Sequence, residues 1–420
     1  MTKTIHQPRY VPEQPNEDPR YNALRNQLKA QAREGLYRSL VSCPRPSQAS
    51  GDATAYWITL CGNDYLGLTQ HPHVHKEAHR ALKEAGAGAG SSRLISGDLP
   101  CHHRLEEELS DFLGTESALL FSSGYHANIG ILTAMARGPA PIVSDALNHA
   151  SIIDGCRLSR APVRIMPHND VTVLERILSD WQVEAGSSSP LVSPPLVVTE
   201  GLFSMEGDRS PIPTIKACCR RAGALLVVDD AHAVGALGNR GEGLSAVGLP
   251  EGADVVVGTF GKAFGSAGAF VAGPRVVREA LINFARTFIF TTALHPAAAG
   301  AALGALEVIR DDPEPRERLR ANASRLREGL RQLGFQLGHA KDHIIPLVVG
   351  DDHGAMALAE QLREKGIFVR GVRPPTVPVG TSRIRITASA LHTEEMIDRV
   401  LSIFEKVRPE RRDEHETPTT

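Results

Sequence analysis

Three apolar segments in the middle of the chain end in polar residues at a regular spacing. PLVVTE carries Thr199, ALLVVDD carries Asp229 and ADVVVGT carries Thr259, at intervals of 30 residues. That interval suits a βαβ unit, in which a crossover helix joins two parallel strands. Because parallel strands present their carboxyl ends at one edge of the sheet, where open α/β folds bind ligands, we expect these polar residues to converge on one site.

The surrounding sequence predicts an α/β architecture with a second, smaller unit. Apolar runs alternate with helix-like segments in a large domain over 61–300, which indicates a mostly parallel sheet. Residues 1–60 are predicted to form an N-terminal arm and a helix over 21–40, where apolar side chains recur at helical spacing. Shorter helices and strands over 301–408 predict a small α+β domain, and the charged tail 409–420 is predicted to be disordered.

Charge and composition exclude several classes of partner. The chain has 420 residues and a net charge of -2, so we expect no nucleic-acid or anionic-membrane surface. No window of 18 uninterrupted apolar residues occurs and the polar N-terminus lacks the apolar core of a signal peptide, which predicts a cytoplasmic protein. The six cysteines include no C-x-x-C and there is no H-E-x-x-H, so no metal site is predicted.

Three common nucleotide and hydrolase motifs are absent. GAGAGSSR, over 86–93, lacks the G-x-G-x-x-G spacing of a dinucleotide site. GTFGKAFG fails as a phosphate-binding P-loop, because Val256 occupies the first glycine position and Ala263 replaces the serine or threonine. No G-x-S-x-G occurs, so a serine hydrolase is not supported.

Lys262 is the leading candidate for a catalytic group. It lies in TFGKAFGSAG, directly after an apolar strand, where burial would lower its pKa and make it nucleophilic. The alternative is a structural lysine that extends from a strand end. Asp229 closes the preceding apolar segment and His232 follows three residues later. A Schiff-base lysine with a buried acid is the pairing that pyridoxal phosphate requires, with the acid keeping the pyridine nitrogen protonated.

Two further segments suit the same cofactor. FSSGYHANIG contains Ser122, Ser123, Gly124 and Tyr125 ahead of a predicted helix, and backbone N–H groups at such a turn bind phosphate. An ordinary strand-to-helix corner is the alternative. His149 in SDALNHAS follows another predicted strand, a position from which its imidazole could stack on the face of a pyridine ring. The alternative is an ordinary loop histidine.

Seven motifs together resemble a known family. They are NDYLGL, GSSRLISG, LNHAS, TEGLFSMEGD, VDDAHAVGALG, TFGKAFG and FTTALHP, and they occur in this order within residues 21–407. The chain therefore resembles the α-oxoamine synthases, which are fold-type-I enzymes dependent on pyridoxal 5'-phosphate. The resemblance implies the α/β fold of those transferases and a homodimer with its sites at the subunit interface.

At matching positions the resemblance implies individual roles in cofactor binding. Lys262 would form the Schiff base and Asp229 would pair with the pyridine nitrogen. The other implied cofactor contacts are His149 on the ring face, Ser204 and His232 on the phenolic oxygen, Gly124, Tyr125 and Thr259 on the phosphate, and Thr292 on the phosphate of the partner subunit's site.

The resemblance also implies substrate contacts. Arg385 would clamp the carboxylate of the amino acid, a bidentate task suited to a guanidinium, with assistance from Asn63. Arg373 would lie near the acyl substrate or the same carboxylate. Arg38, beside Arg33 in the predicted N-terminal helix, is the candidate for a carboxylate at the far end of the acyl chain. The alternative is that both arginines only solvate an exposed helix face.

The implied reaction is a decarboxylative condensation of an amino acid with an acyl thioester. RNQLKAQAREGLYR and VRPPTVPVGTSRIRIT most resemble the branch that joins L-alanine to a pimeloyl thioester, carried by coenzyme A or acyl carrier protein, in biotin biosynthesis. Glycine C-acetyltransferase, 5-aminolevulinate synthase and soluble serine palmitoyltransferase are the alternatives within the family. A catalytically inactive subunit of the same fold is the alternative outside it, and Lys262 argues against that reading.

Overall fold

The computed structural model describes residues 18–41, 57–185, 193–245, 247 and 249–407. The predicted disordered tail and most of the predicted N-terminal arm lie outside these residues. None of the described helices is long and apolar enough to cross a lipid bilayer.

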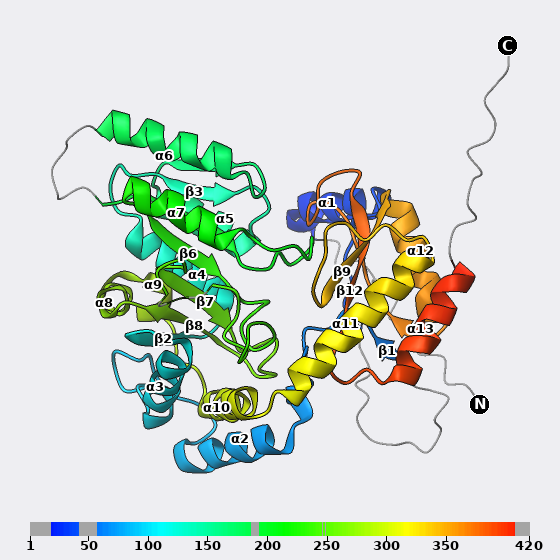
Figure 1. Ribbon diagram of the computed structural model, residues 1–420, viewed down its shortest axis with the longest axis horizontal. Helices are drawn as coiled ribbons and strands as arrows, with labels where there is room; N and C mark the ends of the chain where they lie inside the picture. The colour runs from blue at the N-terminus through cyan, green and yellow to red at the C-terminus, as the bar shows by residue number, and fades with distance from the viewer. Residues whose placement is uncertain (1–17, 42–56, 186–192, 246, 248, 408–420) are drawn as a thin grey trace.

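A seven-stranded sheet forms the centre of the larger domain (Figure 1). In spatial order its strands are β2 (Ser117–Phe121), β8 (Ala269–Gly273), β7 (Val255–Thr259), β6 (Leu225–Asp229), β5 (Leu196–Glu200), β3 (Ile142–Asp145) and β4 (Val163–Met166). β8 runs antiparallel to both of its neighbours, and the remaining pairs are parallel. The predicted α/β class is confirmed.

Helices cover both faces of this sheet. One face packs against α4 (Gly124–Met135), α5 (Ala150–Ser159), α8 (Arg275–Phe284) and α9 (Arg286–Ile289). The other face is covered by α3 (Pro100–Leu113), α6 (Val171–Ala185), α7 (Ile212–Ala222) and α10 (Pro296–Asp311), and α2 (Pro72–Ala85) packs against α10. Successive strand residues alternate between the faces, so Val227 packs in the first layer and Leu226 and Val228 in the second. Burial on both faces explains the continuous apolar runs of the sequence.

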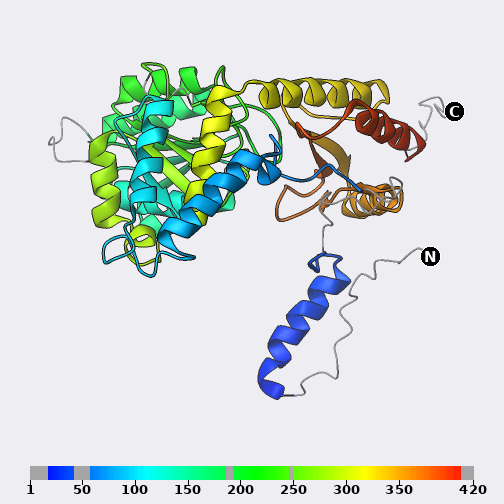
Figure 2. The same ribbon diagram turned by 90° about the horizontal axis from the view of Figure 1, so that it is seen from below.

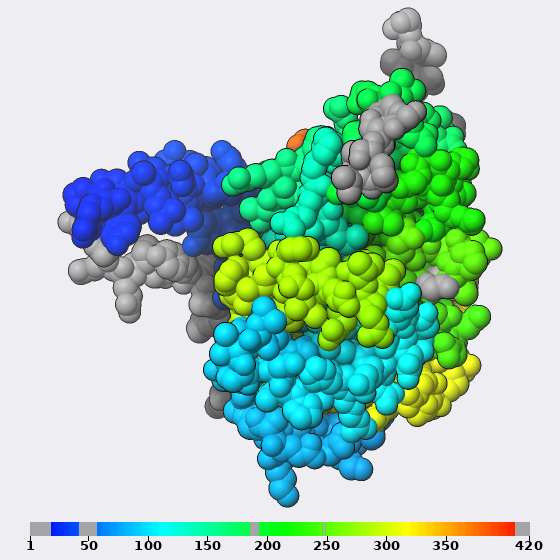
Figure 3. Space-filling view, turned by 90° about the vertical axis from the view of Figure 1, so that its left-hand side faces the viewer, coloured from blue at the N-terminus to red at the C-terminus, as the bar shows by residue number. Residues whose placement is uncertain are grey.

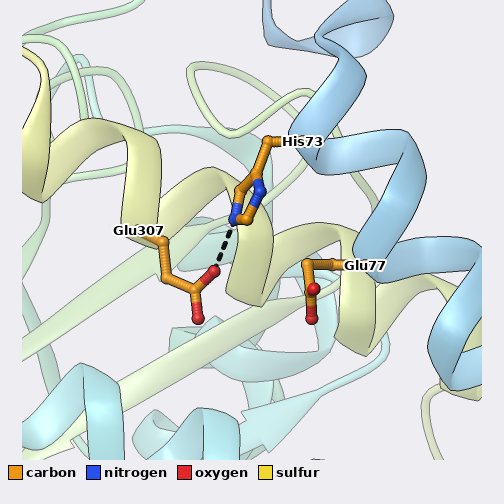
Figure 4. A group of neighbouring side chains, drawn as sticks. All are labelled: His73, Glu77 and Glu307. Carbon is orange, nitrogen blue, oxygen red and sulfur yellow. Dashed lines mark hydrogen bonds and ion pairs between the residues drawn. The ribbon is translucent and has the colours of Figure 1, made fainter.

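Contacts between α2 and α10 join two distant parts of the chain. A Cβ atom on Gly300 would lie 2.5 Å from the backbone oxygen of Glu77, so glycine permits the close approach of the two helices. His73 on α2 bonds Glu307 on α10, with 2.6 Å between Nε2 and Oε2 (Figure 4). Glu77 lies beside this pair and forms an ion pair with Arg80. The N-terminal part of the large domain is thereby fixed to α10.

The smaller domain contains an antiparallel sheet of three strands in the order β11 (Gly371–Val372), β12 (Ser382–Thr387) and β9 (Ile344–Gly350). Its helices are α11 (Glu314–Gln332), α12 (Asp352–Glu364) and α13 (Glu394–Val407). β1 (Ile58–Thr59) pairs in parallel with β10 (Ile367–Phe368). A short segment that precedes the large domain in sequence therefore joins the C-terminal part in space.

The predicted boundary between the two domains does not coincide with the end of a helix or strand. The expected boundary at residue 301 lies inside α10, and the chain leaves that helix at Asp312. The structure has two separate main sheets, each with its own helices, whereas the domain bounds 61–300 and 301–408 stay a prediction. Leu68–Gln70 form a short 3-10 helix between β1 and α2.

The N-terminal helix is shorter than predicted. Pro19–Tyr21 form a 3-10 turn that leads into α1 (Asn22–Arg33), so the helix expected over 21–40 stops at Arg33. Gly35, with φ at 68°, follows the end of α1 in a left-handed conformation that disfavours continuation of the helix. α1 has no buried residue and extends away from the rest of the chain (Figures 2 and 3).

Candidate active site

The carboxyl ends of β5, β6 and β7 lie side by side, as the spacing predicts. Glu200 and Asp229 are register partners on β5 and β6, and Asp229 pairs with Val257 on β7. Thr199 does not join them, because its Oγ1 lies 2.7 Å from Oγ of Ser210 and its side chain is fully buried. The expectation for Thr199 is therefore wrong: strand residues alternate between faces, so Glu200 takes the position beside Asp229.

Lys262 lies directly against His232. Its Nζ is 2.8 Å from Nε2 of His232. Burial lowers the pKa of Lys262 to about 8, against the opposing influence of Asp229 and Glu200, whose negative charges favour the ammonium form. A lysine with this pKa is partly neutral near physiological pH and can act as a nucleophile.

Asp229 is held by donors that the sequence did not reveal. Its Oδ2 accepts a hydrogen bond from Nδ2 of Asn128 at 2.6 Å, and its Oδ1 accepts one from the backbone of Ala231 at 3.1 Å. Asn128 Nδ2 also donates to Oγ of Ser151 at 2.9 Å, which lies 2.8 Å from Nδ1 of His149. A continuous polar chain thus connects Asp229 to the ring predicted to stack on the cofactor. Asn128 carries no motif signal beyond its place in a largely apolar helix.

Glu200 is a second buried carboxyl group that sequence reasoning missed. Burial and the neighbouring charge of Asp229 raise the pKa of Glu200 to about 8. Its Oε2 accepts a hydrogen bond from the backbone N–H of Ser204 at 3.2 Å. Glu200 therefore supports the turn that carries Ser204. In the sequence, the polar pair Thr199-Glu200 at the end of the apolar run PLVVTE was the feature that could have indicated Glu200.

The predicted phosphate-binding residues lie together at the start of α4. Gly124 and Tyr125 open this helix after the cap residue Ser123, and the first N–H groups of a helix have no partner within it. A Cβ atom on Gly124 would lie 3.9 Å from Cβ of Thr259, so β7 ends beside this turn. The hydroxyl of Tyr125 pairs with Asp154, which leaves its backbone N–H as the group available to a phosphate.

Thr292 and its neighbours occupy a nearby surface. Thr292 is exposed and lines a small hollow together with Ser122, from the same turn as the phosphate-binding residues, and Arg93. Nothing in the described chain brings Thr292 into contact with Lys262. Its predicted contact with a second subunit stays a prediction.

Arg385 joins the two domains at the site. Its Nε donates to the backbone oxygen of Ser204 at 2.5 Å, its Nη1 lies 3.3 Å from Oδ1 of Asn63, and its Nη2 lies 3.3 Å from the hydroxyl oxygen of Tyr65. Tyr65 bonds Nδ1 of His232 at 2.7 Å. Asn63 and Arg385 therefore meet as the resemblance implies. Tyr65 belongs to the NDYLGL motif, yet sequence reasoning gave it no role.

Arg38 and Arg373 lie together, but apart from Arg385. Arg373 donates from Nη2 to the backbone oxygen of Tyr37 at 3.0 Å. Both arginines line a cavity of about 470 Å³, together with Arg363 and Arg370. The same cavity is lined by apolar side chains of α12 and of the segment around β11. Four guanidinium groups beside apolar side chains suit a ligand that has an apolar body and an anionic end.

The side chains around Lys262 fit pyridoxal 5'-phosphate. They include a lysine of lowered pKa, an aspartate bonded to Asn128, and His232 against the lysine. His149 is linked to that aspartate through Ser151 and Asn128, and the first turn of α4 lies beside Thr259. These are an amine for covalent attachment, an acid for the pyridine nitrogen and N–H donors for the phosphate.

The aminotransferase class I and II family model matches residues 55–404. The chain belongs to this family. The 8-amino-7-oxononanoate synthase of Anaeromyxobacter dehalogenans is 44% identical over 389 residues, covering 91% of this chain and 95% of that protein. The protein of the same name from Geobacter sulfurreducens is 43% identical over 395 residues, covering 92% and 98%. The family resemblance drawn from the motifs is confirmed.

Solved structures agree with the fold and the cofactor. The serine palmitoyltransferase of Sphingomonas wittichii has a TM-score of 0.80 and 32% identity, covering 92% of this chain and 97% of that one. An 8-amino-7-oxononanoate synthase from Francisella tularensis has a TM-score of 0.70 and 28% identity, covering 83% and 97%. Another serine palmitoyltransferase structure, 32% identical, contains pyridoxal phosphate. The chain is thus a pyridoxal-phosphate-dependent transferase of fold type I.

Proposed function

We propose that this enzyme condenses L-alanine with a pimeloyl thioester, giving 8-amino-7-oxononanoate, CO₂ and the free thiol in biotin biosynthesis. The observation that carries the proposal is the 42–46% identity to 8-amino-7-oxononanoate synthases over most of the chain. The meeting of Lys262, Asp229 and His232 at one sheet edge supports the required chemistry. Action in the cytoplasm stays a prediction.

Pyridoxal phosphate supplies an electron sink for the negative charge that develops at the amino-acid Cα. Lys262 would hold the cofactor covalently, and its amine would move the proton at the amino-acid Cα. Asp229, fixed by Asn128, would hold the proton on the pyridine nitrogen. His149 would pack on the ring face, and Ser204 and His232 would bond the phenolic oxygen.

The substrate carboxylate is assigned to Arg385 and Asn63. Arg385 is buried, and its guanidinium is already oriented by the backbone oxygen of Ser204. A carboxylate held there would be oriented before the reaction, which lowers the entropic cost of reaching the reactive geometry. Gly124, Tyr125 and Thr259 would hold the cofactor phosphate.

We also propose a homodimer, in which Thr292 reaches the phosphate of the partner subunit's site. The exposure of Thr292 beside Ser122 supports this, since it leaves the side chain accessible from outside the chain. Sedimentation velocity tests the assembly, and a monomer that retains full activity would contradict it.

A crossed-substrate assay tests the reaction. Release of free thiol is measured for alanine, glycine, serine and threonine, each with acetyl, pimeloyl and palmitoyl donors on coenzyme A. We expect the alanine and pimeloyl pair to give the highest kcat/KM. Pimeloyl-acyl carrier protein is then compared with pimeloyl-coenzyme A, because either carrier is compatible with the proposal.

Soluble serine palmitoyltransferase is the second candidate. Its specific support is that solved serine palmitoyltransferases match this fold with TM-scores of 0.74 to 0.82, against 0.70 for the Francisella tularensis synthase. A preference for serine and palmitoyl donors in the crossed assay would establish this function and reject the first.

A further inference from the structure

Tyr65 connects the two halves of the site through its hydroxyl group. The side chain is 1% exposed and comes from the loop between β1 and α2. Its hydroxyl oxygen lies 2.7 Å from Nδ1 of His232, 3.0 Å from Oδ1 of Asn63 and 3.3 Å from Nη2 of Arg385. One phenol therefore touches the proposed carboxylate clamp and the histidine assigned to the cofactor.

The number of hydrogens at this junction is limited. Arg385 has only donors, so the oxygen of Tyr65 accepts from it. The single phenol hydrogen then goes either to Asn63 or to His232. Asn63 Oδ1 also lies within 3.3 and 3.4 Å of the two terminal nitrogens of Arg385, which already supply it with hydrogens. Within the described chain, Tyr65 is the one hydrogen-bond partner found for Nδ1 of His232, and its distance is the shorter.

We propose that Tyr65 is a positioning residue that donates its hydrogen to Nδ1 of His232 and so keeps the ring hydrogen on Nε2. Nε2 faces Lys262, the attachment point of the cofactor. In this tautomer the imidazole is a donor toward the cofactor, as a bond to the phenolic oxygen requires. The assignment of His232 to that oxygen rests on the proposed function, and the tautomer is proposed for the cofactor-loaded protein, because a free Lys262 ammonium would itself donate to Nε2.

The environment holds His232 neutral and Tyr65 in place. Burial and nearby positive charge keep the pKa of His232 well below its usual value, so the imidazole is neutral. It then has a single N–H hydrogen, either on Nδ1 or on Nε2. Burial raises the pKa of Tyr65, so the phenol keeps its hydrogen. His343 packs on the ring of Tyr65 with 4.1 Å between centroids. The other titratable or charged groups that influence His232 are Lys262, Arg385, His343 and His149.

Nitrogen NMR of the ¹⁵N-histidine-labelled protein tests the tautomer directly. Nδ1 and Nε2 of a neutral imidazole differ by tens of parts per million according to which carries the hydrogen, and the signals of His232 are assigned by their loss in His232→Gln. We expect the cofactor-loaded wild-type protein, in which the nitrogen of Lys262 is no longer a free ammonium donor facing Nε2, to carry the hydrogen on Nε2. A hydrogen on Nδ1 would overturn the proposal, and this measurement requires no variant of Tyr65.

Tyr65→Phe removes the hydroxyl and keeps the ring. We expect the Nδ1 signal of His232 to move and the visible absorption of the cofactor-loaded protein to titrate at higher pH, because a weaker donor stabilises the ionised phenolic oxygen less. One hydrogen bond of about 1 kcal/mol corresponds to about a fivefold change in the protonation ratio. Tyr21→Phe, at an exposed tyrosine in the 3-10 turn before α1, is the matched control.

The two proposals fail differently in these experiments. If Tyr65→Phe leaves the nitrogen shifts and the absorption titration as in wild type, Tyr65 does not set the tautomer, whatever the enzyme acts on. If the tautomer is as expected but the crossed-substrate assay selects another pair, the positioning role stands and the substrate assignment falls.

Discussion

Replacing Arg38 with alanine should weaken selection for an acyl donor that ends in a carboxylate. A pimeloyl group has this carboxylate and a hexanoyl group lacks it, so the comparison isolates one charge at the end of an apolar chain. Arg38 lines the cavity of about 470 Å³ near β11 and α12. The change removes one guanidinium from that cavity and leaves the site around Lys262 intact.

The expected loss in kcat/KM depends on which of the four arginines of this cavity already have a partner. Arg363 is paired with Glu360, Arg373 donates to the backbone oxygen of Tyr37, and Arg370 lies 5.9 Å from the ring centre of Phe368. Arg38 is the guanidinium of this cavity for which no such contact is found within the described residues. A hydrogen bond to a charged group contributes about 1.5–3 kcal/mol. Because Arg38 is exposed, we expect the lower end, about tenfold in kcat/KM.

The assay measures kcat/KM for pimeloyl-coenzyme A and hexanoyl-coenzyme A in wild type and variant, at saturating alanine. We expect the pimeloyl value to fall about tenfold while the hexanoyl value and the KM for alanine stay unchanged. Arg33→Ala is the matched control, since it removes an arginine from the exposed α1. The reasoning is refuted if the ratio of the two donors is the same in Arg38→Ala and wild type.

Four further outcomes are expected. Lys262→Ala should fold normally, bind no cofactor that borohydride can fix to the chain and lose turnover; a near-normal rate would reject its role. Asp229→Asn should retain cofactor but lose at least about a hundredfold in kcat, because an amide stabilises a protonated pyridine poorly; undiminished kcat would place another acid there. Asn128→Ala should lower kcat about tenfold with unchanged melting temperature if it orients Asp229, and a loss of stability alone would contradict that. In cofactor-free protein, acylation of Lys262 should rise with pH through about 8, where the ammonium loses its proton; a midpoint near 10.5 would contradict the lowered pKa.

Much of the fold was readable from local patterns. The apolar runs that become β5, β6 and β7 are buried on both faces, so their composition alone distinguishes them from half-exposed strands. The final helix and the strands β9 and β12 also agree with their periodicity. The prediction of a helix over 21–40 is wrong beyond Arg33, because Gly35 adopts a left-handed conformation that ends the helix although the amphipathic pattern continues.

The candidate site was found in part. Lys262, Asp229 and His232 stand at strand ends or in small-residue turns, where the sequence pattern itself is informative. Asn128 and Glu200 were missed because their roles depend on a neighbour across the sheet or helix layer. Arg385 and Asn63 were placed only through the family resemblance, since they lie 322 residues apart in the chain.

The sequence by itself determined which strand ends meet, because the length of a βαβ unit and the direction of parallel strands leave little freedom. Only the tertiary structure decided which side chain at each end faces the site. The pleat of β5 turns Thr199 toward Ser210 and Glu200 toward Asp229. It also decided that Tyr65 meets His232 across 167 residues of chain. Such a contact depends on the tertiary packing of segments that are far apart in the chain, and packing leaves no periodic trace in the sequence.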